Sequence, residues 1–170
     1  MKSAPVTTRR GDQGFTSLAT GARVSKASTL IRALGSLDDA NAKIGTARAH
    51  LTTQRYKRVL RHFQKHLGCL MAEVGSRGEK SYFDAKAVKQ VDRRIQVLKK
   101  RCPIKPVFVI PGDTVVGAFL HEARTEVRNA ERRLVQLLED ELVTSKDAVP
   151  FLNRLSDFLF VLASYEERNA

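Results

Sequence analysis

The chain has 170 residues, of which 30 are lysine or arginine and 18 are aspartate or glutamate, so its formal net charge is +12. This length suits one domain with a sizeable core, and we expect residues 1–170 to form a single unit. The apolar runs are far shorter than the roughly 18 residues that a membrane span needs, so no membrane role is expected. Two cysteines are too few for a disulfide framework. We expect a cytoplasmic protein, or a mitochondrial matrix protein if the chain is a trimmed eukaryotic one.

Residues 1–27 form a leader with almost no large apolar side chains. Its central part, Thr7 to Lys26, reads TTRRGDQGFTSLATGARVSK. The glycines permit close approach of the backbone, the hydroxyls can form hydrogen bonds and the basic side chains carry positive charge, which together suit a phosphate chain. The spacing matches neither a Walker A motif nor a dinucleotide fingerprint. A disordered basic arm is the alternative on composition alone.

Residues 28–170 show the periodicity of five amphipathic helices. They are predicted at about Leu30–Leu51, at Tyr56–Val74, from an Asp84 N-cap to Lys100, at Thr114–Leu142, and from a cap at Ser145 or Asp147 to near the C-terminus. The segment VFVIPG at 107–112 is too short for a helix and is expected to be extended or a loop, without a sheet. Short connections favour an all-α fold, an antiparallel five-helix bundle preceded by a long irregular N-terminal loop.

The fourth predicted helix carries a polar patch beside its apolar stripe. Arg124, Arg128 and Glu131 fall within about 60° of one another on a helical wheel, and Arg132 adjoins them. Arginines in that position pair with carboxylate or phosphate groups of a neighbour. An ordinary ladder of salt bridges along the helix is the alternative.

Two other predicted helices place polar residues on or beside their apolar faces. The first helix has Asp38 and Asn41, and the last has Asn153, Arg154 and Asp157. Buried polar groups must be paired, so these residues are either structural or part of a site.

The histidines give a weak signal. His62 and His66 have the i, i+4 spacing of a metal pair, but basic residues surround them and no third ligand is evident, so we expect no metal site. His50 and His121 are expected to be ordinary surface or interface residues.

Four sequence blocks, in order, resemble those of the PduO-type ATP:cob(I)alamin adenosyltransferases. They are the leader pattern from Thr8 to Lys26, GSLDDAN at 35–41, FVIPG at 108–112 leading into HEARTEVRNAERR, and FLNRLSDFLFVLA at 151–163. The resemblance implies a five-helix bundle that forms a homotrimer with active sites between subunits. It also implies transfer of the 5′-deoxyadenosyl group of ATP to the cobalt of cob(I)alamin, with release of triphosphate.

The resemblance assigns roles to residues of the leader and of three helices. Asp38 of one subunit would pair with Arg124 of its neighbour, Arg128 would serve catalysis, and Phe108 would displace the lower axial ligand of cobalamin. ATP with Mg²⁺ would be held by Thr8, Arg9, Arg10, Gly11, Asp12, Gly14, Thr16, Ser17, Lys26, Arg128, Asn129, Ala130, Glu131, Arg132 and Asn153. A reductase or a cobalamin-dependent mutase would be a partner.

Departures from the family pattern motivate two other hypotheses. Asn129 stands where the family commonly has a second arginine, and Asp113 where it has a glycine, which would suit a non-catalytic protein that binds ATP or cobalamin. The basic run Arg55 to Lys65 would suit a helical nucleic-acid binder, but no aromatic residues interleave with these charges, so nucleic acid is not expected as a partner.

Overall fold

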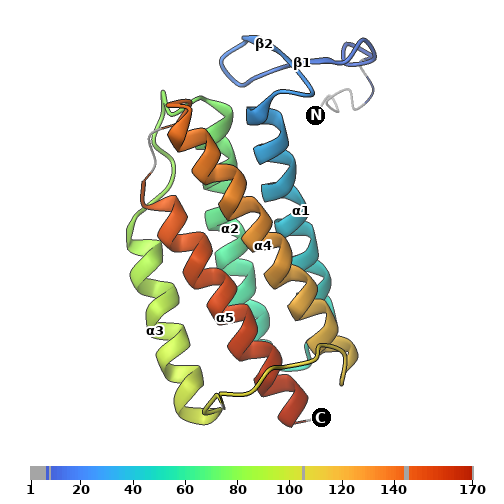
Figure 1. Cartoon of the computed structure of the whole chain (residues 1–170), viewed down its shortest axis with the longest axis vertical. Coiled ribbons are helices and arrows are strands. Elements are labelled where there is room, and N and C mark those ends of the chain that lie inside the picture. The colour runs from blue at the N-terminus through green and yellow to red at the C-terminus, as the bar shows by residue number, and fades with distance from the viewer. Residues whose placement is uncertain (1–6, 8, 105, 144–145, 170) are drawn as a thin grey trace, which may run out of the picture.

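The computed structural model describes residues 7, 9–104, 106–143 and 146–169. In this part of the chain five helices form one bundle, as expected (Figure 1). Their bounds are α1 Thr29–His50, α2 Gln54–Gly75, α3 Lys86–Arg101, α4 Val115–Glu139 and α5 Ala148–Arg168. None of these helices combines the length and the apolar character needed to cross a membrane.

Successive helices along the chain run in opposite directions, but not every pair of helices that pack together is antiparallel. Helix α1 packs against α2 and α4, and α5 packs against α4 and α3. Figure 1 shows α3 and α5 running in the same direction, because α4 returns the chain to the end where α3 begins. The bundle is therefore antiparallel except at the α3–α5 contact.

The core is built from the apolar stripes of all five helices, and aromatic rings lie at its centre. Phe63 of α2 meets Phe158 of α5 edge-on, with ring centroids 5.4 Å apart, and Phe151 lies 6.5 Å from Phe63. All three side chains are fully buried. Each such side chain contributes roughly 1.5–3 kcal/mol of stability by leaving water, so these rings stabilise the contact between α2 and α5.

Helix ends differ in detail from the sequence-based expectation. Helix α3 begins at Lys86, so Asp84 precedes the N-cap position, although its carboxylate still accepts a hydrogen bond from the Lys86 amide at 2.9 Å. Helix α4 ends at Glu139 rather than near residue 142, because Glu141 adopts a φ of 55° and the amide of Leu142 bonds back to the Leu137 carbonyl.

Of the two N-caps predicted for α5, Ser145 and Asp147, the structure describes only Asp147. Asp147 occupies the N-cap position, but its side chain makes no capping hydrogen bond. The other proposed cap, Ser145, lies outside the described residues.

The leader is not irregular throughout, which corrects the sequence-based expectation. Strand β1, Phe15–Ser17, pairs antiparallel with β2, Arg23–Ser25, so that Thr16 lies opposite Val24. Three-residue strands are too short to show a period of two in the sequence. The buried side chain of Leu18 fastens this hairpin to the bundle.

Residues 107–112 form an exposed loop without strand structure, as expected. Phe108 is 92% exposed, and Val107 and Ile110 are also largely exposed. This loop lies at one end of α4, and the leader hairpin lies beyond the other end (Figure 1). The 25 residues of α4 span about 37 Å, so one chain holds these two segments far apart.

Candidate functional site

The leader folds into a tight turn around one lysine. Gly14 donates from its amide to the Gly11 carbonyl, and the Lys26 amide donates to the Gly14 carbonyl at 2.8 Å. The ammonium group of Lys26 lies so close to Gly11 that a Cβ atom there would approach Nζ to 2.9 Å. Gly14 has a φ of 80°, a conformation that side chains other than glycine rarely adopt. The turn thus places the positive charge of Lys26 beside glycine backbone that a ligand can approach closely.

The other leader residues assigned to the nucleotide lie on or near the same turn. Arg9 adopts a φ of 56°, and its carbonyl accepts from the Asp12 amide at 3.3 Å. The side chains of Arg10, Asp12 and Ser17 are exposed, whereas Thr16 is half-buried in β1. Thr8 lies outside the described residues.

Three arginines follow one face of α4. Arg124, Arg128 and Arg132 are separated by four residues each, so they lie on successive turns. Arg124 is half-buried and the other two are exposed. Burial, with a smaller contribution from the charge of Arg128, lowers the pKa of Arg124. Within the described ranges none of the three forms a salt bridge, and Glu131 forms none either, so the alternative of an ordinary ladder is wrong for this face.

A polar network joins α4 to α1 beside these arginines. Asn129 donates from Nδ2 to Glu126 Oε1 at 2.7 Å and to the Ser36 hydroxyl at 3.4 Å. Lys43 of α1 lies 3.2 Å from Glu122 and 3.5 Å from Glu126, and its hydrogen bond to Glu122 is the main cause that raises the pKa of Lys43. Asn129 therefore helps to link α4 to α1 within one chain.

Asp38 is exposed on the outer side of α1, which corrects the prediction that it sits on or beside the apolar face. Ser36 and Lys43 face α4, and a residue two positions after Ser36 points about 200° away from it. Asp38 is exposed, and no ion pair joins it to Arg124 within the described part of the chain. Asn41 does sit at the apolar face, where its Oδ1 is buried without a hydrogen-bond partner among the described residues.

Arg154 and Asp157 lie at the surface of α5, which corrects the prediction that they sit on or beside its apolar face. Both side chains are about half exposed and lie 3.2 Å apart, and Arg154 also contacts Asp92 of α3 at 3.2 Å. They act as a surface link between α3 and α5. Asn153, which precedes them, is half-buried.

His121, expected to be an ordinary surface or interface residue, is buried between α4 and α5. Only 3% of it is exposed, and its Nδ1 accepts a hydrogen bond from Nε of Arg124 at 3.3 Å. Its Nε2 lies 3.7 Å from Glu167 Oε1 of α5. Burial, and secondarily the charge of Arg124, lowers the pKa of His121, while burial and then the charge of Asp113 raise the pKa of Glu167. On a helical wheel, His121 lies beside the apolar residues Leu120 and Ala123 and one turn before Arg124. That position is the sequence signal for its burial.

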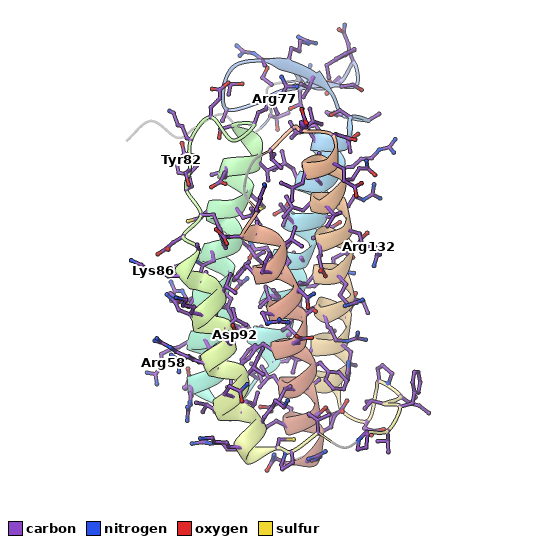
Figure 2. The ribbon with its side chains drawn as sticks, turned by 60° about the vertical axis from the view of Figure 1, so that its left-hand side comes forward. Arg58, Arg77, Tyr82, Lys86, Asp92 and Arg132 are labelled. Atoms are coloured by element: carbon purple, nitrogen blue, oxygen red, sulfur yellow. The ribbon has the colours of Figure 1, made fainter. Side chains whose placement is uncertain are left out.

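Apart from Asp38 of α1 and Asn153 of α5, the assigned residues fall into three separate groups in one chain. The leader turn lies at one end of the bundle, the Phe108 loop lies at the other, and the arginine face runs along α4 between them (Figures 1 and 2). Figure 2 shows Arg132 on the outside of the bundle. Among the hydrogen bonds and ion pairs of the described residues, none links the leader to these arginines. No set of three or more histidine, cysteine, aspartate or glutamate side chains in the described part is placed to hold a metal ion.

The chain matches the family described as cobalamin adenosyltransferase over residues 6–166. It is 34% identical over 168 residues to the corrinoid adenosyltransferase PduO of Citrobacter freundii, covering 96% of this chain and 50% of that protein. It is 32% identical over 170 residues to the corrinoid adenosyltransferase MMAB of Homo sapiens, covering 93% of this chain and 67% of that protein. The chain therefore spans about half the length of the PduO proteins that it matches.

The fold is also similar to solved structures with ligands. A variant PduO-type ATP:corrinoid adenosyltransferase from Lactobacillus reuteri, complexed with cobalamin and ATP, superposes with a TM-score of 0.89 at 26% sequence identity, covering 96% of this chain and 94% of that one. A second variant of that enzyme, complexed with ATP, superposes with a TM-score of 0.88 at 28% identity, covering 96% of this chain and 94% of that one. The sequence match along almost the whole chain and the shared bundle agree: this chain belongs to the cobalamin adenosyltransferase family.

Proposed function

We propose that the chain transfers the 5′-deoxyadenosyl group of ATP to the cobalt of cob(I)alamin and releases triphosphate. The observation that carries the proposal is the leader turn, in which Lys26 lies against Gly11, in a chain whose fold superposes on a relative complexed with cobalamin and ATP. A lysine charge beside exposed backbone suits a polyphosphate. The arginine face of α4 supplies further charge of the same kind.

The reaction needs positioning and charge stabilisation rather than a general base. Cob(I)alamin attacks C5′ of ATP, a cobalt–carbon bond forms with the electron pair of Co(I), and the C5′–oxygen bond breaks as triphosphate leaves with that bond's pair. Negative charge therefore builds on the departing triphosphate, where Lys26, Arg128 and Arg132 would stabilise it. Phe108, on its exposed loop, would take the place of the lower axial ligand of cobalamin.

Mg²⁺ fits the donors that the leader offers. This ion prefers oxygen ligands and is usually held by one or two protein oxygens together with phosphates and water. Asp12 is exposed on the turn, and the hydroxyls of Thr16 and Ser17 follow it on opposite faces of β1. Asp12, with one of these hydroxyls, would hold the ion, which would neutralise part of the phosphate charge.

The separation of the leader from the Phe108 loop supports a site shared between copies of the chain. The adenosyl carbon and the cobalt must meet, yet one chain holds the two segments at opposite ends of a helix about 37 Å long. We propose that the leader of one copy works with the arginine face and the Phe108 loop of a neighbour. Head-to-tail contacts of this kind close into rings, and a homotrimer is the ring that we propose.

The cellular setting follows from the same proposal. A reductase would have to supply cob(I)alamin, and a cobalamin-dependent mutase would use the product. We propose a cytoplasmic enzyme, or a mitochondrial matrix enzyme if the chain is a trimmed eukaryotic one.

The test supplies purified protein with ATP, Mg²⁺ and chemically reduced cobalamin. We expect the Co(I) absorbance to disappear and a light-sensitive adenosyl product to form, with no change when ATP is omitted. If the Co(I) absorbance persists with ATP present, adenosyl transfer by this chain is ruled out.

A second candidate is a protein that binds ATP or cobalamin without turnover. It is favoured by Asn129, whose amide is already used by Glu126 and Ser36, and by the negative charge of Asp113 beside the Phe108 loop. Measured release of triphosphate would exclude this candidate.

A further inference from the structure

A second basic site lies on the other side of the bundle. A cavity of about 580 Å³ opens between α2 and α3, and four arginines line it: Arg55 and Arg58 from α2, and Arg93 and Arg94 from α3. Figure 2 shows Arg58 and Arg132 on opposite sides of the molecule. The cavity is therefore separate from the arginine face of α4, and no role proposed above uses it.

The four arginines have no acidic partners where the chain is described. No carboxylate lines the cavity, and none of the four forms a salt bridge there. The nearest acidic residue in sequence, Asp92, is held by Arg154 of α5 at 3.2 Å. Four like charges around one cavity repel one another unless an anion lies between them. Solvent screens part of this repulsion, since Arg58, Arg93 and Arg94 are exposed, but the four unpaired guanidinium groups are available to an anion.

A hydrogen bond joins the two walls of the cavity. Nε2 of His62 in α2 lies 2.6 Å from Oε1 of Gln90 in α3. Both residues line the cavity. This hydrogen bond links the two helices that carry the arginines.

The size and the lining indicate a small ligand that binds through charge. Ligand sites for small molecules commonly enclose about 300–1,000 Å³. Of the apolar residues that line the cavity, Val59 is 8% and Phe63 1% exposed, and only Val97 of α3, at 41%, offers an apolar surface to a ligand. A docked helix of a partner protein would need a broader apolar floor, and a nucleic-acid strand would need exposed aromatic rings to stack on. Guanidinium groups match phosphate oxygens in pairs.

We propose that this cavity, the α2–α3 site, binds an oligophosphate of up to nucleotide size, such as free triphosphate or a nucleoside triphosphate. It holds the ligand between the arginines of two helices. The site is distinct from the leader turn and does not depend on adenosyl transfer for its existence.

The test measures binding of inorganic triphosphate to the full chain by isothermal titration calorimetry at low salt. Arg58→Gln combined with Arg94→Gln removes one guanidinium from each wall. Both residues are exposed, so the variant should fold, which its thermal melting curve would verify. Lys89→Gln combined with Lys99→Gln removes the same charge from exposed positions of α3 that do not line the cavity.

We expect the arginine variant to weaken one class of binding site by about tenfold or more, since hydrogen bonds to charged groups are the strong ones, while the lysine variant keeps it. Lys26→Gln should leave this class intact, because Lys26 belongs to the leader. Equal binding by the arginine variant and the unaltered chain, or equal loss in both double variants, would overturn the proposal.

Two further arms identify the ligand. ATP is titrated in parallel, and tighter binding than triphosphate at this site would assign it to a nucleotide, whereas equal binding would assign it to the phosphates alone. A short glutamate peptide that binds more tightly than triphosphate would overturn the proposal in favour of a docking surface for an acidic protein. The adenosyl-transfer rate of the arginine variant is measured alongside and should be unchanged, so failure of this proposal is distinguishable from failure of the proposed enzyme activity.

Discussion

Arg124 donates a hydrogen bond from Nε to Nδ1 of the buried His121, 3.3 Å away on the preceding turn of α4. This bond uses the inner nitrogen of the guanidinium group and leaves the two terminal nitrogens for a partner. On the other side of the imidazole ring, Nε2 lies 3.7 Å from Glu167 of α5. The orientation of Arg124 thus depends on the packing of α4 against α5.

We expect His121→Ala to lower kcat/KM for cob(I)alamin by about tenfold, because loss of one hydrogen bond to a charged group costs roughly 1.5–3 kcal/mol. His121→Asn should restore most of that loss, since the asparagine Oδ1 can take the place of Nδ1 as acceptor. Initial rates of Co(I) loss over a range of cob(I)alamin concentrations would measure both variants. Equal defects in the two would show that His121 contributes only bulk to the core.

Lys26→Ala should raise KM for ATP by about tenfold, since it removes the charge that lies against Gly11 in the leader turn. Lys80, which is exposed in the loop after α2, provides the matched control. Rates at varied ATP concentration would separate the two variants. If Lys80→Ala raises KM as much as Lys26→Ala does, the effect comes from net charge and not from the turn.

Glu166 is buried enough that burial raises the pKa of its carboxyl, and its Oε1 has no hydrogen-bond partner in the described structure. A raised pKa means that the folded state favours the protonated acid, so stability is present below the ordinary value of 4.5 and is lost as the pH rises through the folded-state pKa. Because Glu166 is only half-buried and solvent screens part of its charge, Glu166→Gln should increase the free energy of unfolding at pH 7 by less than about 1 kcal/mol and have little effect at pH 4.

Urea unfolding at the two pH values would measure this difference. The control is Glu139→Gln, at the exposed end of α4, which should change stability at neither pH. A loss of stability at pH 7 in Glu166→Gln would mean that the carboxylate has a partner, such as a residue of a second copy.

Glu73 is a buried carboxylate that holds the loop after α2. Its Oε2 accepts hydrogen bonds from the amides of Tyr82 and Phe83, both at 2.9 Å, and only 4% of the residue is exposed. Glu73→Ala should lower the free energy of unfolding by about 3 kcal/mol, because two amides lose a charged acceptor. Glu79→Ala, in the same loop but exposed, should have almost no effect in the same chemical denaturation experiment. If Glu73→Ala left the free energy of unfolding unchanged, water would have to replace the carboxylate as the acceptor.

Two helical glycines should respond oppositely to alanine. At Gly68 a Cβ atom meets nothing within 4 Å, whereas at Gly117 it would lie 2.5 Å from Glu167 Oε1 and 2.7 Å from its Cγ. Gly68→Ala should therefore stabilise the protein by roughly 0.5–1 kcal/mol through helix propensity. Gly117→Ala should lose that gain and destabilise the protein by about 1 kcal/mol, because Glu167 must move away from His121. Thermal melting would compare them, and a gain at Gly117 would show that Glu167 moves freely.

The helices were predictable because helical periodicity is a local property. The apolar residues of each helix recur every three or four positions, and all five segments are helical within a few residues of the expected bounds. The errors fall at the ends, such as the early end of α4, where Glu141 takes a left-handed conformation. The hairpin was missed because each of its strands has only three residues.

The environment of single polar residues was less predictable. Asp38 and Asn41 look alike on a wheel, yet Asp38 is exposed and Asn41 has a buried oxygen. The sequence predicts His121 as a surface or interface residue, and it is buried against α5. The sequence places Arg154 on or beside an apolar face, and it pairs with Asp92 at the surface.

By itself, the sequence determined the five helices, the polar leader and the excess of positive charge, because these depend on which residues follow one another along the chain. Only the tertiary structure decided that Arg124 rests on His121, that the leader and Phe108 lie at opposite ends, and that four arginines from two helices line one cavity. Those relationships depend on which helices pack together and at what level, and helix packing joins residues that are far apart in the sequence.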